Sequence, residues 1–404
     1  MSMNIALTGL NAANEDLSVT SNNLANVATV GFKGSRTEFA DLFASTQQGA
    51  IATGNGVDVA EVAQQFTQGN IETTGNTLDM AVSGNGYFIV SNNGALNYTR
   101  DGEFQLNSDG QVVTASGQLL QGYPPLANGT FNTGGLGDIT LTTNESQPKA
   151  TSTAQITANL PADATPPADA PFNATDPNSY NNTTSLTVYD SLGAAHTASL
   201  YFINTAPNAW EAQLTVDGTA VGAPQPLTYS QTGQLLTPAN GQVTFPAYTP
   251  ATGAQAMNMT FNFSNTTQYG GNFGVTAVQQ NGYTTGQLTG INISQTGVVQ
   301  AQFTNGNSVN LGQVALATFA NSQGLQQLGN ASWSATQASG AAVNGIAGNS
   351  GFGNIQSGSL EESNVDTTSA LVDMITAQRD FQANAQMIQT EDQVTQSIIN
   401  IRGG

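Results

Sequence analysis

The sequence predicts a mainly β subunit with an α-helix at each end, built from nested domains. Apolar residues recur about every seven positions near both termini, whereas short runs of alternating polar and apolar residues fill the middle. A period of seven predicts helices that pack along a seam, and a period of two predicts strands. A chain with its adhesive helices at its two ends is expected to assemble with copies of itself.

The first helix is expected within residues 1–28. Its apolar stripe consists of Met3, Leu10, Leu17 and Leu24, with Ala6, Ala13, Thr20 and Val27 interleaved. The predicted assembly residues of this helix are Leu10, Leu17, Leu24 and Val27. The interleaved positions are mostly Ala and Thr, which fill a helical seam poorly, and the far side is polar. Such a helix is marginal in isolation, so we expect it to gain order from neighbours.

The second helix is expected within residues 360–404, paired with the first in one helical core domain. Early acids such as Glu361 suit the positive end of a helix dipole. Polar residues interrupt the stripe, so this seam is also imperfect. The predicted assembly residues of this helix are Leu371, Met374, Phe381, Ile388 and Ile399.

The middle of the chain divides by its patterning. Residues 29–70 contain several glycines and predict a connector with extended pieces. Strand patterns in 71–145 and 286–359 predict one β-rich domain, into which a second one, 146–285, is inserted. Six prolines lie in 146–182, and we interpret that stretch as a linker or long loop at the entry of the insertion.

Three runs share one turn pattern, in which a glycine follows three polar residues and precedes apolar ones. Glycine accepts the positive φ that hairpin turns require. The pattern therefore predicts three hairpins of one style, at residues 107–113, 230–236 and 294–299.

Composition excludes several classes of protein. The 404 residues include 6 basic and 26 acidic ones, for a net charge of −20, which argues against binding to nucleic acids or anionic membranes. The absence of cysteine excludes disulfides and thiolate metal sites. The first residues lack the pattern of a cleaved signal peptide, and no apolar run is long enough to span a membrane.

The sequence offers little for catalysis. His196 is the sole histidine, and we interpret it as a surface residue of a strand rather than part of a Ser/His/Asp site. The acids form no conspicuous pair, and no calcium loop or phosphate-binding loop is present. We therefore expect no enzyme activity, no metal and no cofactor.

Two motifs at the ends resemble the signatures of the bacterial flagellar axial proteins, a superfamily of rod, hook and hook-associated proteins. They are TSNNLANVATVGFK at residues 20–33 and LVDMITAQRDFQANAQ at 371–386. The runs at 35–43 and 185–193 are similar to hook members, and the run at 98–106 is shared with rod members. The matching residues of the first motif and the connector include Asn22, Asn23, Asn26, Gly31, Phe32 and Lys33.

The resemblance implies a structural subunit of the flagellar hook. Such a subunit builds a flexible tube that transmits torque from the rod to the filament, with terminal helices lining the export channel and the insertion outermost. It also implies other copies of the chain, the distal rod, the hook cap, the hook–filament junction proteins and the export apparatus as partners, outside the cell. A distal rod or hook-associated protein is the alternative, and a secreted β-rich enzyme or adhesin is a distant one.

Overall fold

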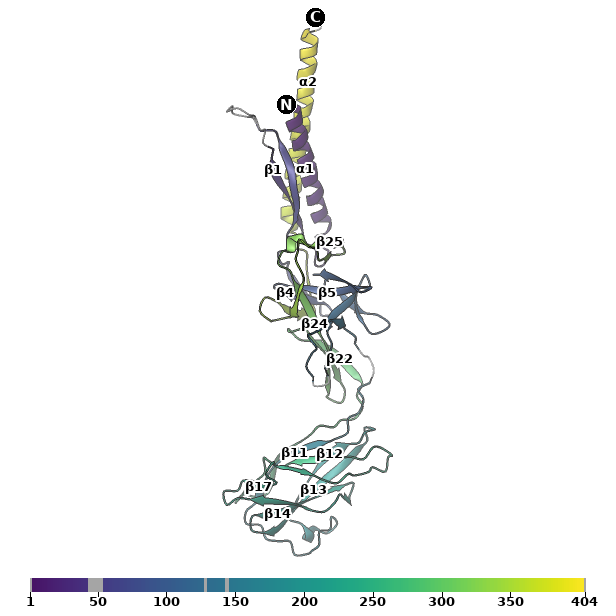
Figure 1. Cartoon of the computed structure of the whole chain (residues 1–404), viewed down its shortest axis with the longest axis vertical. Helices are drawn as coiled ribbons and strands as arrows, with labels where there is room; N and C mark the ends of the chain where they lie inside the picture. Colours follow the sequence, from purple (N-terminus) through teal and green to yellow (C-terminus); the bar gives the residue numbers. More distant parts are fainter. Residues whose placement is uncertain (1, 43–53, 127–128, 142–144, 403–404) are drawn as a thin grey trace. The chain divides into compact units, whose positions relative to one another are not determined.

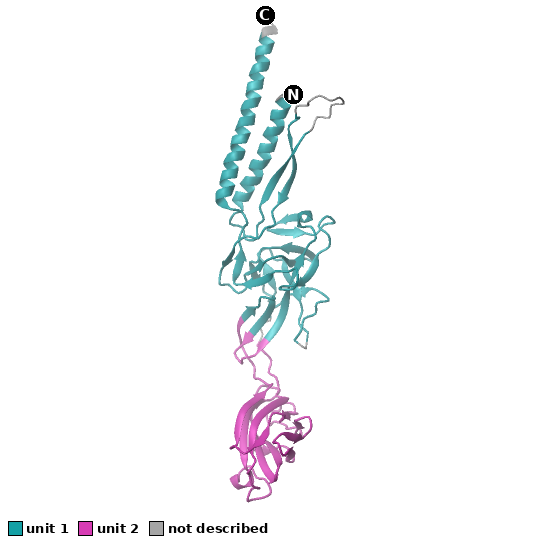
Figure 2. Cartoon of the chain, turned by 90° about the vertical axis from the view of Figure 1, so that its left-hand side faces the viewer, with its two compact units in different colours: residues 1–143, 291–301, 309–404 teal, residues 144–290, 302–308 magenta. Residues whose placement is uncertain are grey.

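The structure is a computed structural model, and it describes residues 2–42, 54–126, 129–141 and 145–402. The chain forms two compact units (Figure 2). Unit 1 comprises residues 1–143, 291–301 and 309–404, and unit 2 comprises 144–290 and 302–308. The helices and the adjoining β-body fall within the same unit, so their division into separate domains stays a prediction.

The two terminal helices of unit 1 lie side by side and run antiparallel (Figure 1). They are α1 (Ser2–Ala25) and α2 (Thr367–Arg402). At 1.5 Å per residue they measure roughly 36 and 54 Å, and α2 continues past the start of α1 (Figure 2). We call α1 and α2 the helix pair.

The second helix begins later than the predicted residue 360. Strand β29 (Ser359–Glu361) pairs with β3 (Ile71–Thr73), which holds this segment extended. The helix then starts after Asp366, whose Oδ1 accepts a hydrogen bond from the Ser369 amide at 2.7 Å. This N-cap satisfies an amide that would otherwise lack a partner.

The predicted connector contains a long antiparallel hairpin beside α1. Its strands are β1 (Ser35–Asp41) and β2 (Val57–Gln64). The run at 35–43 that resembles hook members thus forms β1, although its last residue, Phe43, lies outside the described residues.

The β-body continues from this connector. Strand β4 (Met80–Ser83) pairs with β28 (Asn354–Ser357), joining segments from opposite ends of the sequence. A 12-stranded sheet follows, with buried Phe88, Val90, Val314 and Leu316 in one core. Its strands, in chain order, are β5 (Tyr87–Asn92), β6 (Ala95–Thr99), β7 (Phe104–Leu106), β8 (Val112–Thr114), β9 (Leu119–Tyr123), β10 (Gly137–Asp138), β22 (Leu288–Ile293), β23 (Val298–Phe303), β24 (Ser308–Thr318), β25 (Gln326–Gly329), β26 (Ser332–Ser334) and β27 (Val343–Ile346).

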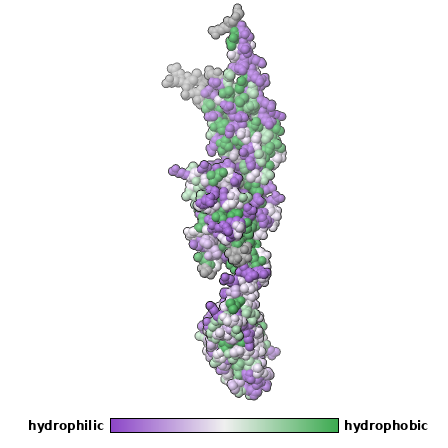
Figure 3. Space-filling view, turned by 90° about the vertical axis from the view of Figure 1, so that its right-hand side faces the viewer, coloured by the Kyte–Doolittle hydropathy of each residue, from purple (hydrophilic) through white to green (hydrophobic). Residues whose placement is uncertain are grey.

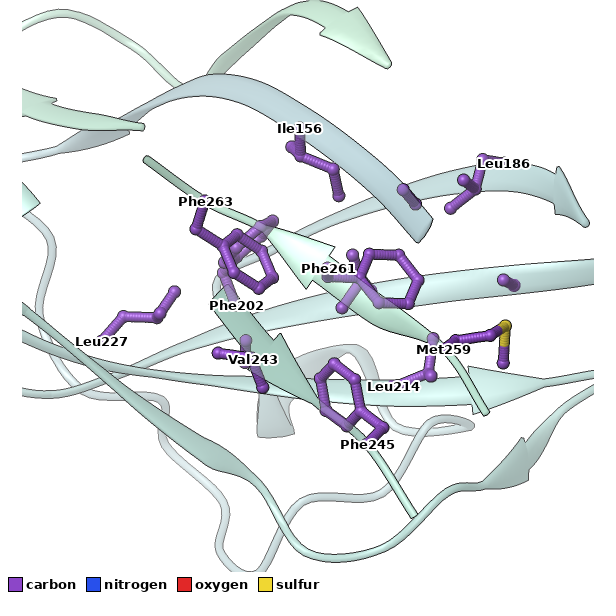
Figure 4. Packing of buried hydrophobic residues seen from close by; sticks show 14 of the residues in the cluster. Ile156, Leu186, Phe202, Leu214, Leu227, Val243, Phe245, Met259, Phe261 and Phe263 are labelled. Carbon is purple, nitrogen blue, oxygen red and sulfur yellow. The ribbon is translucent and has the colours of Figure 1, made fainter. Parts of the chain in front are cut away.

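Two sheets of unit 2 enclose a second core (Figure 4). Met257, Met259, Phe261 and Phe263 alternate in sequence and all point inward. One sheet contains β11 (Thr153–Pro161), β18 (Gln242–Thr244), β19 (Thr260–Asn262), β20 (Thr267–Tyr269) and β21 (Gly274–Gln280). The other contains β12 (Asn182–Tyr189), β13 (Ala195–Ala206), β14 (Ala209–Val216), β15 (Thr219–Ala220), β16 (Gln225–Tyr229) and β17 (Leu235–Thr237).

The interpretation of 146–182 as a linker or loop is wrong in part. Strand β11 occupies nine residues of this stretch, and its buried side chains are Ala154, Ile156, Ala158 and Leu160. These residues alternate with polar ones, which is the pattern of a strand with one face in the core. The flanking prolines lie outside the strand or at its last residue, where the ladder does not require their missing N–H.

The three predicted hairpin turns are confirmed and share one geometry. The glycines Gly110, Gly233 and Gly297 have φ of 75°, 78° and 79°. In each turn the glycine N–H donates to the carbonyl three residues earlier, at 3.1, 2.9 and 2.9 Å respectively. This geometry matches a short hairpin loop that ends in a left-handed residue, for which glycine is the favoured choice.

Candidate assembly site

The seam of the helix pair consists mainly of small side chains. Ala6, Ala13 and Thr20 of α1 are buried, as are Ala370 and Ala377 of α2. The helices approach closely, since a Cβ added at Gly9 would lie 2.7 Å from Asn384 Oδ1. The alanines and threonine that the sequence analysis judged weak therefore occupy the centre of the seam.

The larger predicted residues flank this seam to different extents. All four predicted assembly residues of the first helix are half-buried. Three of the five predicted assembly residues of α2 are half-buried as well. The half-buried residues are Leu10, Leu17, Leu24, Val27, Met374, Phe381 and Ile388. The structure does not bring Leu371 and Ile399 to the seam, since they are 44% and 63% exposed.

Several large apolar side chains of α2 consequently remain exposed within the subunit. Apolar side chains are visible on the surface of the helical part in Figure 3. Burying such residues in an assembly would release about 1.5–3 kcal/mol for each large side chain. The exposed apolar residues of α2 are Leu371, Val372, Ile375, Met387, Val394, Ile398 and Ile399.

The asparagines of the first motif finish α1 and attach the connector to it. Asn26 donates its amide N–H and its Nδ2 to the Asn22 carbonyl, at 3.1 and 2.9 Å. Asn23 holds both backbone groups of Ser35, accepting from its N–H at 2.9 Å and donating to its carbonyl at 2.7 Å. These side chains therefore fix where the first strand of the hairpin begins.

A buried ionic cluster lies where the N-terminal segment meets the β-body. Lys33 Nζ lies 2.6 Å from Glu361 Oε1, and Arg100 Nη1 lies 2.9 Å from Glu361 Oε2. Glu361 is fully buried, and both cations are nearly so. Burial lowers the pKa of Lys33, and Arg100 acts in the same direction, while Glu361 opposes them.

Backbone groups complete the coordination of these charges. Lys33 also donates to the Thr67 carbonyl at 2.8 Å, and Arg100 donates to the Gly84 carbonyl at 2.7 Å. The Gly69 amide donates to Glu361 Oε1 at 3.0 Å. A buried charge is tolerated only with such partners.

Two neighbours of Lys33 in the motif place it in the cluster. Gly31 has φ +66°, and its amide donates to the Glu361 carbonyl at 2.8 Å. Phe32 is buried. We call Gly31, Lys33, Arg100 and Glu361 the junction.

Two members of the junction, Glu361 and Arg100, were not predicted from the sequence. Glu361 was expected to be an early acid of the second helix, but it lies in β29, with its side chain inside the protein. Arg100 was noted only within a shared run. No local signal in the sequence links Arg100 or Glu361 to Lys33, because Glu361 lies 261 and 328 positions away from these two cations.

His196 is buried, so its interpretation as a surface residue is wrong. Its Nδ1 lies 2.6 Å from Asp217 Oδ2 and its Nε2 lies 3.3 Å from Asp190 Oδ2. Burial lowers the pKa of His196, but hydrogen bonds to and charges on the two aspartates outweigh burial and raise it overall. Both ring nitrogens face carboxylates, so neither is placed to activate a serine.

This arrangement predicts a pH optimum for the stability of unit 2. The raised pKa of His196 gives stability that is complete below its unfolded value and is lost as pH rises through the folded value. Although burial alone would raise them, hydrogen bonds hold the pKa values of Asp190 and Asp217 low, so their contribution is lost on acidification. We expect maximal stability between these two limits.

Hydrogen exchange of β13 in the full-length chain, measured against urea, checks this expectation. The urea midpoint should fall as pH rises from about 6 to about 9. The variant His196→Gln should have a lower midpoint that no longer depends on pH in that range. An equal slope in both proteins would contradict the role of His196.

Other chemistry is sparse in the described part of the chain. Its residues contain no group of three or more His, Asp or Glu side chains placed to hold a metal ion. None of its helices is long and apolar enough to cross a membrane. The features that remain are the exposed apolar side chains of the helix pair and the junction that connects this pair to the β-body.

Four family models match the chain in succession. They are the flagella basal body rod protein model at residues 3–33, the flagellar hook protein FlgE/F/G D1 domain at 81–165, the flagellar basal body protein FlaE D2 domain at 159–283, and the flagellar basal body rod FlgEFG protein C-terminal model at 356–401. The fold and these matches define the class as a flagellar axial protein with terminal helices.

Full-length relatives identify the branch of this class. The flagellar hook protein FlgE of Salmonella typhimurium strain LT2 is 40% identical and that of Escherichia coli K12 is 39% identical, each over 100% of both chains. A Helicobacter pylori flagellar hook protein, FlgE2, shares the fold, with a TM-score of 0.53 over 70% of this chain and 99% of that one, at 13% identity. The chain belongs to the flagellar hook protein family, and its role is that of a hook subunit.

Proposed function

We propose that copies of this chain assemble through their helix pairs into a flexible helical tube. The tube transmits torque from the rod and motor to the filament and encloses the export channel. The exposed apolar side chains of α2 carry this proposal, because a single subunit leaves them uncovered. Imperfect seams keep the isolated ends weakly ordered, and assembly repays the cost of ordering them.

We assign each predicted domain to one layer of the tube. Residues 1–28 and 360–404 form the inner tube, 71–145 with 286–359 an inner β-domain, and 146–285 the outer domain. Residues 29–70 connect the tube to the β-domains. The junction, which joins the N-terminal segment to the β-body through charged groups, supports this arrangement by transmitting load between them.

The tube requires partners at both ends. We propose that it contacts the distal rod below, the hook cap during growth and the hook–filament junction proteins above. The subunit reaches this extracellular place through the flagellar export apparatus. The mainly small-residue seam supports passage of an unfolded chain, since few large contacts need to break.

Charges introduced on the helix pair test the proposal. Leu17→Asp or Phe381→Asp places a carboxylate on a half-buried apolar position, so we expect tube assembly to be lost. Far-UV circular dichroism of the β-sheets should stay unchanged. Electron microscopy and sedimentation measure the assembly.

Ser18→Asp is the matched control, since Ser18 lies beside Leu17 and is exposed. It should assemble like the unmodified chain. Normal tubes from Leu17→Asp or Phe381→Asp would refute the assignment of the helix pair to the inner tube.

A further inference from the structure

An apolar groove lies between the helix pair and the β1–β2 hairpin. Its volume is about 540 Å³. Phe39, at its hairpin wall, is 48% exposed although its side chain is large and apolar. Two carboxylates, Asp16 and Asp380, also line the groove. The other lining residues are Ile5, Gly9, Ala12, Ala13, Gly56, Val57, Ala377, Ala383 and Asn384.

A second surface, apolar with one positive charge, lies on another side of α2. Leu371, Val372 and Ile375 are 44%, 57% and 49% exposed. Arg379 follows Ile375 by four positions, so it lies on the same face of the helix. Among the described residues, Arg379 has no hydrogen-bond or ion-pair partner for its side chain. We call these four residues the α2 patch.

Among the cations of unit 1 whose side chains the structure describes, Arg379 is the one without a carboxylate partner. The chain has 6 basic residues. Lys33 and Arg100 are held by Glu361, and Arg36 pairs with Glu38 at 2.6 Å. Covering the α2 patch removes Arg379 from water, and a buried guanidinium requires an anion. The groove supplies one beside its apolar surface.

We propose that the α2 patch of one copy docks in the groove of the next, with Arg379 paired to Asp16 of that copy. This inference rests on the proposed assembly and names the surfaces that form it. Apolar surface meets apolar surface, and the charges are opposite. Because patch and groove lie on different sides of the helix pair, the contact is heterologous and can repeat indefinitely along a helical lattice.

A charge exchange in the full-length chain tests the pairing. Arg379→Asp and Asp16→Arg should each raise the critical concentration for assembly at least about tenfold, because like charges then meet in the contact. The double variant should return to within about threefold of the unmodified chain, since the pair is restored in reverse. Sedimentation of polymer against subunit concentration measures all three.

Glu15 provides the matched control, because it neighbours Asp16 and is exposed. Glu15→Arg combined with Arg379→Asp should assemble as poorly as Arg379→Asp alone. Normal assembly of Arg379→Asp, or equal rescue from position 15, would overturn the pairing while leaving the proposed tube intact. An unmodified chain that forms no polymer would overturn the pairing together with the proposed function.

Discussion

Replacing Glu361 with glutamine is expected to destabilise unit 1 by about 3–5 kcal/mol, because it leaves Lys33 and Arg100 buried without a counter-charge. Both cations contact this one carboxylate, at 2.6 and 2.9 Å. Hydrogen exchange of β3 and β29 in increasing urea should report the loss directly, since these strands flank the junction. Unit 2 should keep its urea midpoint.

Glu362→Gln is the control for the lost charge. Glu362 is the next residue and is exposed, so its replacement should change stability by less than about 0.5 kcal/mol. Equal effects of the two substitutions would mean that the buried cluster does not stabilise the junction.

The second large effect is expected from Gly31→Ala. A Cβ at this position would lie 2.5 Å from the Asp101 amide nitrogen, and the backbone has φ +66°. The left-handed conformation costs roughly 1–2 kcal/mol for a residue with a Cβ, and the clash with backbone adds to it. We expect unit 1 to lose about 3 kcal/mol in total.

Gly54→Ala is the control, because it shows what replacing a glycine costs at a position without a clash or a positive φ. Gly54 has open space around its Cβ position and no positive φ. Its replacement should be close to neutral in the same urea experiment. If Gly31→Ala were equally harmless, the close approach of residue 31 to the β-body would be wrong.

Local patterns in the sequence predicted much of the fold. The alternation at Met257, Met259, Phe261 and Phe263 is typical of an extended segment with one face in the core, and all four side chains are buried. The three glycine turns predicted hairpins because positive φ is a local requirement. The end helices followed from their seven-residue period, although α2 starts at Thr367 because an extended segment and Asp366 precede it.

Two features could not be read from local patterns. The stripe indicated which side of each helix is apolar, but it did not predict that alanines would form the seam and leave Leu371 exposed, since that depends on how closely the helices approach. Strand β11 was hidden because prolines surround it. Frequent prolines indicate a loop, yet a strand forms when the residues within its hydrogen-bonded ladder are not proline.

The junction could not be predicted because its charged residues lie far apart in the sequence. Glu361 lies 328 positions from Lys33 and 261 from Arg100 in the sequence. No periodicity links residues so distant. Long-range backbone contacts bring them together, among them the pairing of β3 with β29 and the hydrogen bond from the Gly31 amide to the Glu361 carbonyl.

The same separation fixes an order of events in folding. A chain delivered with its amino end first exposes Lys33 and Arg100 long before Glu361 is available. All residues of unit 2 emerge before Glu361, so this unit can fold while the junction is still open. Closing a contact of such high sequence separation is slow. The last part of the chain to emerge therefore completes the junction. The helix pair cannot be fixed to its β-body until nearly the whole chain has emerged.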